Sequence, residues 1–553
     1  MLKIIPLGGL GEIGLNMMVI EYGEVIFIID AGLMFPEEYM LGVDIVIPAM
    51  DYLLENRDKI QGIIITHAHE DHIGALPYLL RQIRLPVYGT GFTLRIIRNK
   101  LIEFKLNKYI DLNLVNPGET FAIEPFEIEF IRVSHSTIDG VGLAIKTPEG
   151  MIVHTGDFRI SHNADKMRDT DISSFAKWGG KGVLALLSDS TNVEIEGYTI
   201  SEHEVADNLE KLIDAARDRV IVALFASNVF RIQQVIDIAV KNGRKVIFNG
   251  RSIEQIVAVA MELGHITCPE NTIMDVEQID KCSDDQVVII TTGSQGEPMS
   301  ALVRMASGMH KKVKIKKGDQ VILSSKHIPG NEKAIASIIN KLYRRGADVV
   351  YSKIAQIHTS GHAHREELKL MMNLIKPEYF IPIHGEYRHL VVHARLAEEQ
   401  GMKKKNVIVA EDGDVISFNK EGNKDIGRID KRVNTGRVFV DGKGIGDVGR
   451  SVLKQRRELS EGGLVVVTMI LDEETGVVLY GPQLISKGFI FDSATGYLIE
   501  DAQCVILEIV EEMAPETELK VEVLTKKLQK ALKQYFYFTI NRRPLIVPVI
   551  IEV

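Results

Sequence analysis

Short apolar runs separated by polar clusters dominate the first part of the chain. Three such runs lie at Val25–Ile29, Gly62–Ile65 and Val183–Leu187. Runs this short and this apolar are typical of strands buried on both faces. The polar residues that follow them are Asp30, Thr66 with His67, and Ser188 with Asp189. Because open α/β sheets place ligands beyond the carboxyl ends of their strands, the pattern predicts a functional site at one sheet edge.

From about residue 201 the pattern changes to alternating helices and strands. Ser201 is expected to cap a helix, with Glu204 as its capping-box partner. Strands are predicted at Val220–Phe225, Lys245–Phe248, Val287–Thr291 and Gln320–Leu323. The helical patterns between them favour parallel βαβ units. Polar motifs return only at residues 357–362 and 381–386, so the block between them is expected to be an inserted domain.

These patterns predict an α/β protein of several domains. The first domain is expected to comprise residues 1–200 and 351–425, with an inserted α/β domain at 201–350, a linker at 426–460 and a small C-terminal α/β domain at 461–553. The linker is predicted from its richness in Gly, Arg, Lys and Asp. The C-terminal part is expected to contain strands and one amphipathic helix.

Composition places the chain among ordinary globular proteins. It has 553 residues, of which 45% are hydrophobic and 25% charged, enough to fill a large core. The sequence contains neither an apolar run of roughly 18 residues nor a recognisable secretory signal, so no membrane association is expected. The three cysteines, Cys268, Cys282 and Cys504, have no paired zinc-ligand spacing. A reducing cytoplasm is therefore the expected compartment.

The net charge of −10 does not favour a nucleic-acid substrate, although local charge matters more than the sum. Basic stretches lie at residues 311–317, at Lys403–Lys405 and at Arg456–Arg457. Each also fits an ordinary solvated surface, so the sequence leaves open whether they contact RNA.

A dense cluster of metal-binding residues follows the second apolar run, in the sequence Thr66-His67-Ala68-His69-Glu70-Asp71-His72. On a loop after a strand, His67 and His69 can point to one metal ion. Asp71 and His72, at the start of the next helix, can point to a second. Neutral imidazole and carboxylate are the usual zinc ligands. The alternative is a surface loop that happens to be rich in histidine.

Further ligands follow other apolar strands. His135, Asp157 and His384 each fit a structural role when taken alone, but their order and context favour metal binding. A carboxylate at Asp157 could bridge two ions, as two-metal sites about 3.5–4 Å apart require. The sequence therefore predicts two zinc ions per subunit, held by His67, His69, Asp71, His72, His135, Asp157 and His384.

Residues 66–72 resemble the signature of the metallo-β-lactamase fold, an αββα sandwich. His135, Asp157 and His384 stand where that superfamily's other ligands are expected. Asp30 matches its opening motif and is expected to orient the ligands from behind.

Three further segments resemble motifs A, B and C of the β-CASP nucleases, which carry a nucleic-acid-clamping insertion: Leu187–Thr191, Ser360–Ala363 and Pro382–Glu386. Nearly the whole chain is similar to the bacterial ribonuclease J family, on the segments Gly8–Asn16, Ala226–Asn228, Thr292–Pro298, Ile328–Glu332 and Gly446–Gly449. This resemblance implies endonuclease and 5′-to-3′ exonuclease activity on single-stranded RNA, including 5′-monophosphorylated RNA, in rRNA processing and mRNA decay. The sequence leaves the oligomeric state open, although a strand-rich C-terminal domain suits a homodimer or homotetramer, and other RNA-decay proteins are possible partners.

The resemblance also assigns roles to individual residues. His362 is expected to donate a hydrogen bond or proton to the phosphate, although His364 nearby is a rival for that role. The family positions that touch the nucleotide match Ser227, Asn228, His358, Thr359, Ser360 and Gly361. Asp189 is expected to support the site from behind. The turn containing Ser294 and Gln295 could cradle a phosphate with its backbone amides, or could be a plain strand-to-helix connection.

The mechanism implied is attack on phosphorus by a hydroxide made from water whose pKa two zinc ions lower towards roughly 7. Mn²⁺ or Mg²⁺ could substitute for zinc. Asp44 and Asp441 match positions of a structural calcium ion, and equally fit solvated surface acids.

Three other functions remain open: a small-molecule hydrolase of the same fold, a non-catalytic RNA-binding partner subunit, and a DNA-repair nuclease. A small-molecule hydrolase would leave the inserted domain unexplained. A non-catalytic partner subunit usually lacks some metal ligands, whereas all seven are present here. A DNA-repair nuclease would be distinguished by competition between RNA and DNA of one sequence, because only RNA has the 2′-OH.

Overall fold

The computed structural model describes residues 1–160, 169–297, 299–325, 331–419, 427–489, 496–513 and 521–553. It divides into two compact units, residues 1–34 with 47–437, and residues 35–46 with 438–553. Pro298 and Ile328–Gly330, which belong to two of the family segments, lie outside the described residues. Among the residues that the structure describes, no helix is long and apolar enough to cross a membrane.

Two sheets form the centre of the first unit. One runs in the order β22 (Gly427–Arg432), β21 (Asp414–Phe418), β1 (Leu2–Gly8), β3 (Met17–Tyr22), β4 (Val25–Ile29), β6 (Ile60–Ile64), β7 (Val87–Gly89) and β8 (Leu112–Leu114). The other runs in the order β19 (Tyr379–Ile383), β13 (Ala185–Asp189), β12 (Gly150–His154), β11 (Val141–Thr147), β10 (Phe126–Arg132) and β9 (Thr120–Ile123). β4 and β6 pair in parallel, as do β12, β13 and β19, so their carboxyl ends share one edge in each sheet.

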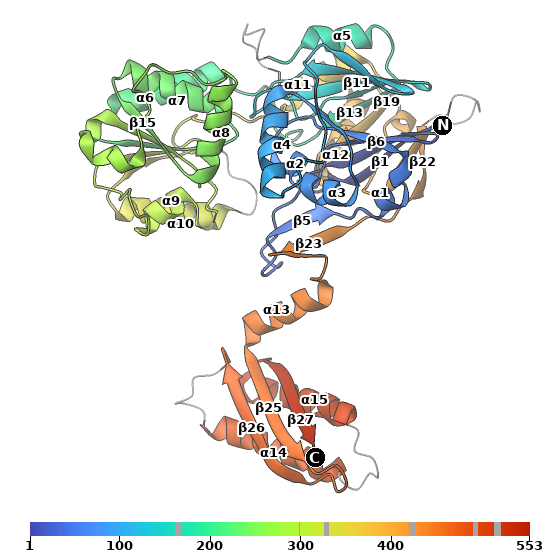
Figure 1. Ribbon diagram of the computed structural model, residues 1–553, viewed down its shortest axis with the longest axis vertical. Helices are drawn as coiled ribbons and strands as arrows, with labels where there is room; N and C mark the ends of the chain where they lie inside the picture. Colours follow the sequence, from blue (N-terminus) through green and yellow to red (C-terminus); the bar gives the residue numbers. More distant parts are fainter. Residues whose placement is uncertain (161–168, 298, 326–330, 420–426, 490–495, 514–520) are drawn as a thin grey trace. The chain divides into compact units, whose positions relative to one another are not determined.

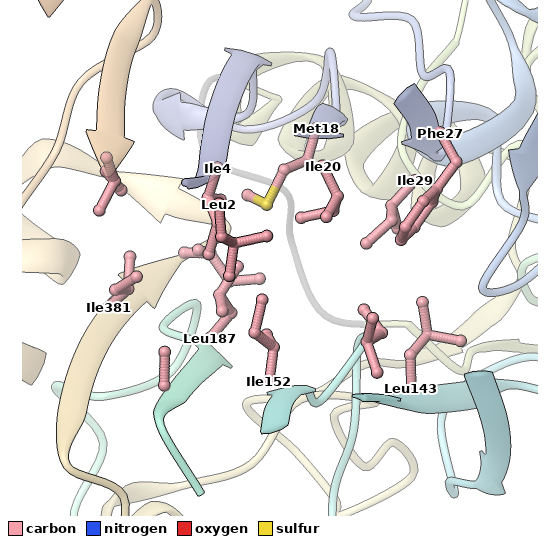
Figure 2. Close-up of a cluster of buried hydrophobic side chains, with 14 of the residues drawn as sticks. Leu2, Ile4, Met18, Ile20, Phe27, Ile29, Leu143, Ile152, Leu187 and Ile381 are labelled. Carbon is pink, nitrogen blue, oxygen red and sulfur yellow. The ribbon is translucent and has the colours of Figure 1, made fainter. Parts of the chain in front are cut away.

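The core of this unit lies between the two sheets, whose side chains face one another in Figure 2. Ile4 and Phe27 from the first sheet and Ile152 and Leu187 from the second are fully buried. Burial of a side chain of this size contributes roughly 1.5–3 kcal/mol. This packing holds the strand ends, and therefore the loops that follow them, in fixed positions.

Helices cover the outer faces of the sandwich (Figure 1). The helices that pack on the outer face of the second sheet are α5 (Ile172–Gly179), α11 (Arg365–Ile375) and α12 (Tyr387–Glu399). In the first sheet, β6 is followed by α2 (Glu70–Ile73) and α3 (Leu76–Gln82), and β7 by α4 (Gly91–Glu103). The short helix α1 (Asp51–Glu55) comes before β6 and follows β5 (Ile45–Pro48), a strand of a separate sheet. The predicted αββα sandwich is therefore confirmed.

The inserted domain has a parallel sheet in the order β15 (Lys245–Asn249), β16 (Val287–Thr291), β14 (Val220–Ala223), β17 (Gln320–Leu323) and β18 (Asp348–Val350). One face is covered by α6 (Glu202–Ala215), α7 (Val229–Lys241) and α8 (Arg251–Glu262), and the other by α9 (Ala301–Ser307) and α10 (Glu332–Arg344) (Figure 1). The Ser201 hydroxyl caps α6 by accepting the Glu204 N–H at 3.1 Å, which confirms the predicted N-cap. The reciprocal contact of the Glu204 side chain, which would complete a capping box, stays a prediction.

The second unit contains a sheet in the order β26 (Val478–Lys487), β25 (Leu464–Leu471) and β27 (Leu545–Glu552). Two helices pack on one face of it, α14 (Gly496–Met513) and α15 (Val521–Ile540). The sequence predicted one helix here, so that expectation was wrong within the described residues. The segment predicted as a linker holds β22, β23 (Arg437–Asp441), β24 (Gly444–Ile445) and most of α13 (Arg450–Gly462).

Candidate metal centre

The predicted ligands lie on loops that leave the carboxyl ends of sandwich strands. The loop after β6 carries His67 and His69, and the helix α2 that follows it carries Asp71 and His72. His135 and Asp157 follow β10 and β12. His384 follows β19 with a positive φ of 54°, a conformation that turns the chain sharply into the short strand β20 (Gly385–Glu386). β20 pairs with β2 (Leu10–Gly11), which fixes this turn from the other side.

Three imidazoles form a first group of potential ligands. The Nε2 atoms of His67 and His135 lie 3.0 and 3.1 Å from Nδ1 of His69. All three nitrogens therefore face one point, and His67 and His135 are 1% and 7% exposed. The side chain of Ser227, from the inserted domain, lies 3.1 Å from the other His69 nitrogen, Nε2. Such a contact on the outer nitrogen leaves Nδ1 available to a metal.

A second group consists of Asp71, His72, Asp157 and His384. The Oδ2 atom of Asp157 lies 3.2 Å from His72 Nε2 and 3.5 Å from His384 Nε2. The same oxygen lies 3.7 Å from His67 Nε2 and 3.9 Å from His135 Nε2 in the first group. One buried carboxylate oxygen thus stands between two sets of donors, which is the position of a bridging ligand.

The chemistry of the donors fits divalent cations. Burial lowers the pKa values of His67 and His135 well below the usual value, and lowers that of His69 to about 4, so these rings are neutral. Neutral imidazole is the form that binds zinc. The Nε2 atom of His384 is buried without a hydrogen-bond partner although it faces the second group. A cation there would satisfy it.

The carboxylates of the second group are ionised. Burial raises the pKa of Asp157, but the nearby His384 and His72 rings more than offset this and hold it well below its usual range. Burial also raises the pKa of Asp71, but the nearby rings, His72 first, more than offset this and lower it below its usual value. Burial lowers the pKa of His72, yet the Asp157 and Asp71 carboxylates raise it well above its usual value. These carboxylates attract positive charge into the second group.

Asp30 is hydrogen-bonded to His72 on the side away from the second group, and its role in orienting a metal ligand stays a prediction. It is 2% exposed, and its Oδ2 atom accepts a hydrogen bond from His72 Nδ1 at 2.7 Å. Its Oδ1 atom accepts the Thr66 N–H at 2.8 Å. These bonds fix the His72 tautomer, so that Nε2 faces the second group.

Replacing Asp30 by asparagine is expected to weaken metal binding by about 10–100-fold, because the amide cannot hold the His72 ring with a carboxylate's strength. Competition with a chromophoric chelator measures this affinity. Asp171→Asn, which changes a carboxylate that caps α5, is the matched control and should bind metal normally. Unchanged affinity in Asp30→Asn would assign Asp30 a purely structural role.

Asp189 and His362 adjoin these donors, and His362 also belongs to two further groups that could hold a metal ion, with His135 and Asp157 and with Asp189 and His384. Asp189 Oδ2 accepts a hydrogen bond from His362 Nδ1 at 2.8 Å. The His362 ring stacks on that of His384 at 5.2 Å and meets that of His135 edge-on at 4.8 Å. Burial lowers the pKa of His362, but the Asp189 carboxylate more than offsets this and raises it above the usual value, which favours the protonated ring. A contact between His362 and a phosphate stays a prediction.

His364 is placed differently from His362. It is the N-cap of α11, where it takes part in a capping box with Glu367. A histidine in that position serves the helix end, which supports His362 over His364 as the residue at the centre.

The loop before His362 also touches the centre. The Gly361 carbonyl accepts a hydrogen bond from His135 Nδ1 at 2.8 Å, and a Cβ at this position would lie 2.6 Å from the His135 ring. Ser360 Oγ accepts from Asn192 Nδ2 at 2.7 Å. No pattern in the sequence selected Asn192; its only signal is its place directly after motif A. It also donates to the His362 carbonyl at 3.1 Å and so joins motifs A and B.

Other predicted substrate contacts have structural partners. Asn228 caps α7 by accepting the Arg231 N–H at 3.0 Å. Thr359, 3% exposed, donates its hydroxyl to the Ile200 carbonyl at 2.7 Å. His358 is half-buried on the same loop. Their contacts with a nucleotide remain predictions.

The remaining candidates lie apart from these groups. Ser294 is buried, and Gln295 donates to Ser325 at 3.0 Å within the inserted domain. In the second unit, the Asp44 carboxylate accepts the Gly442 N–H at 2.7 Å. The Asp441 carboxylate forms an ion pair with the Arg456 guanidinium at 2.5 Å. The phosphate and calcium roles stay predictions.

Known proteins resemble the chain over its full length. It is 41% identical to ribonuclease J2 of Bacillus subtilis, covering 100% of this chain and 98% of that protein. It is 40% identical to ribonuclease J 1 of Streptococcus pyogenes, covering 99% and 97%, and 38% identical to ribonuclease J 2 of Staphylococcus aureus, covering 100% and 98%. A crystal structure of a protein of unknown function from Enterococcus faecalis V583 shares the fold, with a TM-score of 0.54 at 17% identity over 75% of this chain and 99% of that one.

Family models divide the chain in the same way. Residues 10–214 match the metallo-β-lactamase superfamily, 217–342 the ribonuclease J β-CASP domain, 347–410 the Zn-dependent metallo-hydrolase RNA specificity domain, and 451–553 the ribonuclease J C-terminal domain. Together with the buried donor groups, these matches define a metal-dependent nuclease of the metallo-β-lactamase fold with a β-CASP insertion. Within that class the chain belongs to the ribonuclease J family, and it is a metal-dependent ribonuclease that binds RNA.

Proposed function

We propose that this ribonuclease holds two zinc ions and hydrolyses phosphodiesters of single-stranded RNA, both internally and in the 5′-to-3′ direction from a 5′-monophosphate. The observation that carries the proposal is the Asp157 Oδ2 atom, which lies within 3.9 Å of histidine nitrogens in both donor groups. His67, His69 and His135 would hold one ion, and Asp71, His72 and His384 the other, with Asp157 shared. RNA processing and decay in the cytoplasm, by a homodimer or homotetramer, is the expected setting.

Zinc bound at such a site lowers the pKa of water and neutralises charge on phosphate oxygens. The protein's own groups supply the rest. Asp189 keeps His362 protonated and oriented, and His362 donates to a phosphate oxygen or to the leaving oxygen. Ser227 holds the outer nitrogen of His69, so that the inserted domain contributes directly to the centre.

Cleavage of end-labelled RNA tests the substrate class and the cleavage mode together. We expect the zinc-loaded protein to shorten 5′-monophosphorylated RNA to mononucleotides, to cut 5′-triphosphorylated RNA only internally, and to leave DNA of the same sequence largely intact. Cleavage of DNA at the same rate would mean that the 2′-OH is not recognised and would contradict an RNA-specific site. Identical products from both 5′ ends would reject the 5′-end preference.

A further inference from the structure

The loop of residues 357–362 follows the inserted domain and ends at His362. Two buried arginines donate hydrogen bonds to it. Arg231, on α7, donates from Nη1 to the Ile357 carbonyl at 2.9 Å. Arg159 donates from Nη1 to Thr359 Oγ1 at 3.2 Å and to the Ser360 carbonyl at 3.4 Å. The two guanidiniums therefore fix the loop at its start and at its middle, just before His362.

One carboxylate joins both guanidiniums. Glu202, at the start of α6, accepts Arg159 Nη2 on Oε1 at 2.9 Å and pairs with Arg231 Nη2 through Oε2. The exposed fractions of Glu202, Arg159 and Arg231 are 8%, 5% and 0%. Gln234 adds a link, because it accepts from Arg231 Nε and donates to the Glu202 carbonyl. Arg159 stands two residues after Asp157, so the network begins next to the metal centre.

The planar, forked shape of the guanidinium group explains how Glu202 can fix the 357–362 loop through the two arginines. Each arginine gives one nitrogen to Glu202 and another to the loop, and the planar group holds these two directions in a fixed relation. Fixing the carboxylate therefore fixes where the loop's acceptors must lie. Without that carboxylate, two buried positive groups would face each other unpaired, which is strongly unfavourable.

We propose that Glu202 is a positioning residue, which sets the 357–362 loop and through it the place of His362 beside the metal centre. The consequence for turnover rests on the function proposed above, in which His362 donates to the phosphate. The placement of the loop itself does not depend on that function.

Two variants separate positioning from general stability. Glu202→Gln removes the charge that pairs both arginines. Asp319→Asn is the matched control, because Asp319 pairs with buried Arg219 at 2.6 Å in the same inserted domain and is 1% exposed. Hydrogen exchange of the amides of residues 357–362 reports the loop, kcat and KM on RNA report catalysis, and elemental analysis reports the metals.

We expect the loop amides of Glu202→Gln to exchange at least about 10-fold faster than in the unchanged protein, and kcat to fall by about 10²-fold with metal content retained. Asp319→Asn should leave both the loop exchange and kcat near the unchanged values. If Glu202→Gln does not fold, Arg159→Lys replaces it in the experiment, because lysine keeps the positive charge but lacks the planar group that binds Glu202 and the loop together. Arg159→Lys should show the same faster loop exchange and the same fall in kcat.

Three results would overturn the proposal: unchanged loop exchange in the folded Glu202 or Arg159 variant, an equal loss of kcat in Asp319→Asn, or a faster-exchanging loop with unchanged kcat. If the unchanged protein does not cleave RNA, the proposed function fails, and hydrogen exchange alone still decides whether Glu202 sets the loop.

Discussion

Asp71→Ala is expected to bind one metal ion per chain instead of two and to lose RNA cleavage by at least about 10³-fold. The Asp71 carboxylate lies 3.6 Å from His384 Nε2 and 3.7 Å from His72 Nε2, both members of the second donor group. Its loss removes an anionic ligand from that group and leaves the three imidazoles of the first group intact. Elemental analysis of the dialysed protein, with cleavage of labelled RNA, measures both effects.

Asp58→Ala is the matched control for this variant. The Asp58 side chain is 97% exposed, so its loss should change neither metal content nor turnover. Two retained metal ions with near-normal cleavage in Asp71→Ala would show that Asp71 is not a ligand, and would leave the second group without its expected composition.

His362→Ala is expected to keep both metal ions while losing about 10²–10⁴-fold in kcat, the usual contribution of a positioned proton donor. The prediction follows from the hydrogen bond to Asp189, which holds the ring as a cation at the edge of the centre. Single-turnover cleavage of RNA gives the rate, and elemental analysis gives the metal content.

His364→Ala provides the comparison, since this residue caps α11 two positions further along the chain. It should retain near-normal turnover and lose only about 1 kcal/mol of stability, the typical cost of a lost helix cap. Loss of metal from His362→Ala would instead make His362 a ligand, and equal losses of turnover in both variants would remove the distinction between them.

Much of the fold could be predicted because its signals are local. The apolar runs that form β4 and β6 end at residues that face the site, and the inserted domain's strands are parallel as the spacing indicated. The helix α14 was not predicted, although its buried positions Leu498, Ala502, Ile506 and Val510 recur every four residues, as on one face of a helix.

In the candidate site, too, residue types could be predicted from the sequence, but contacts between residues far apart in the sequence could not. Histidines and aspartates after strands could be selected from the sequence because metal ligands require those residue types. The pairing of Arg159, Glu202 and Arg231 could not, because Glu202 has the sequence character of an ordinary acid in the first turn of a helix. Only the packing of α6 and α7 beside the loop after Asp157 brings the three together. Partners separated by 29 or 43 residues in sequence leave no local pattern.

Anomalous X-ray scattering at the zinc absorption edge, from crystals of the zinc-loaded protein, tests the shared metal centre most directly. The expected map has two zinc peaks per chain, roughly 3.5–4 Å apart, with the Asp157 carboxylate touching both. A single peak, or peaks that Asp157 does not reach, would contradict a centre built on one bridging carboxylate.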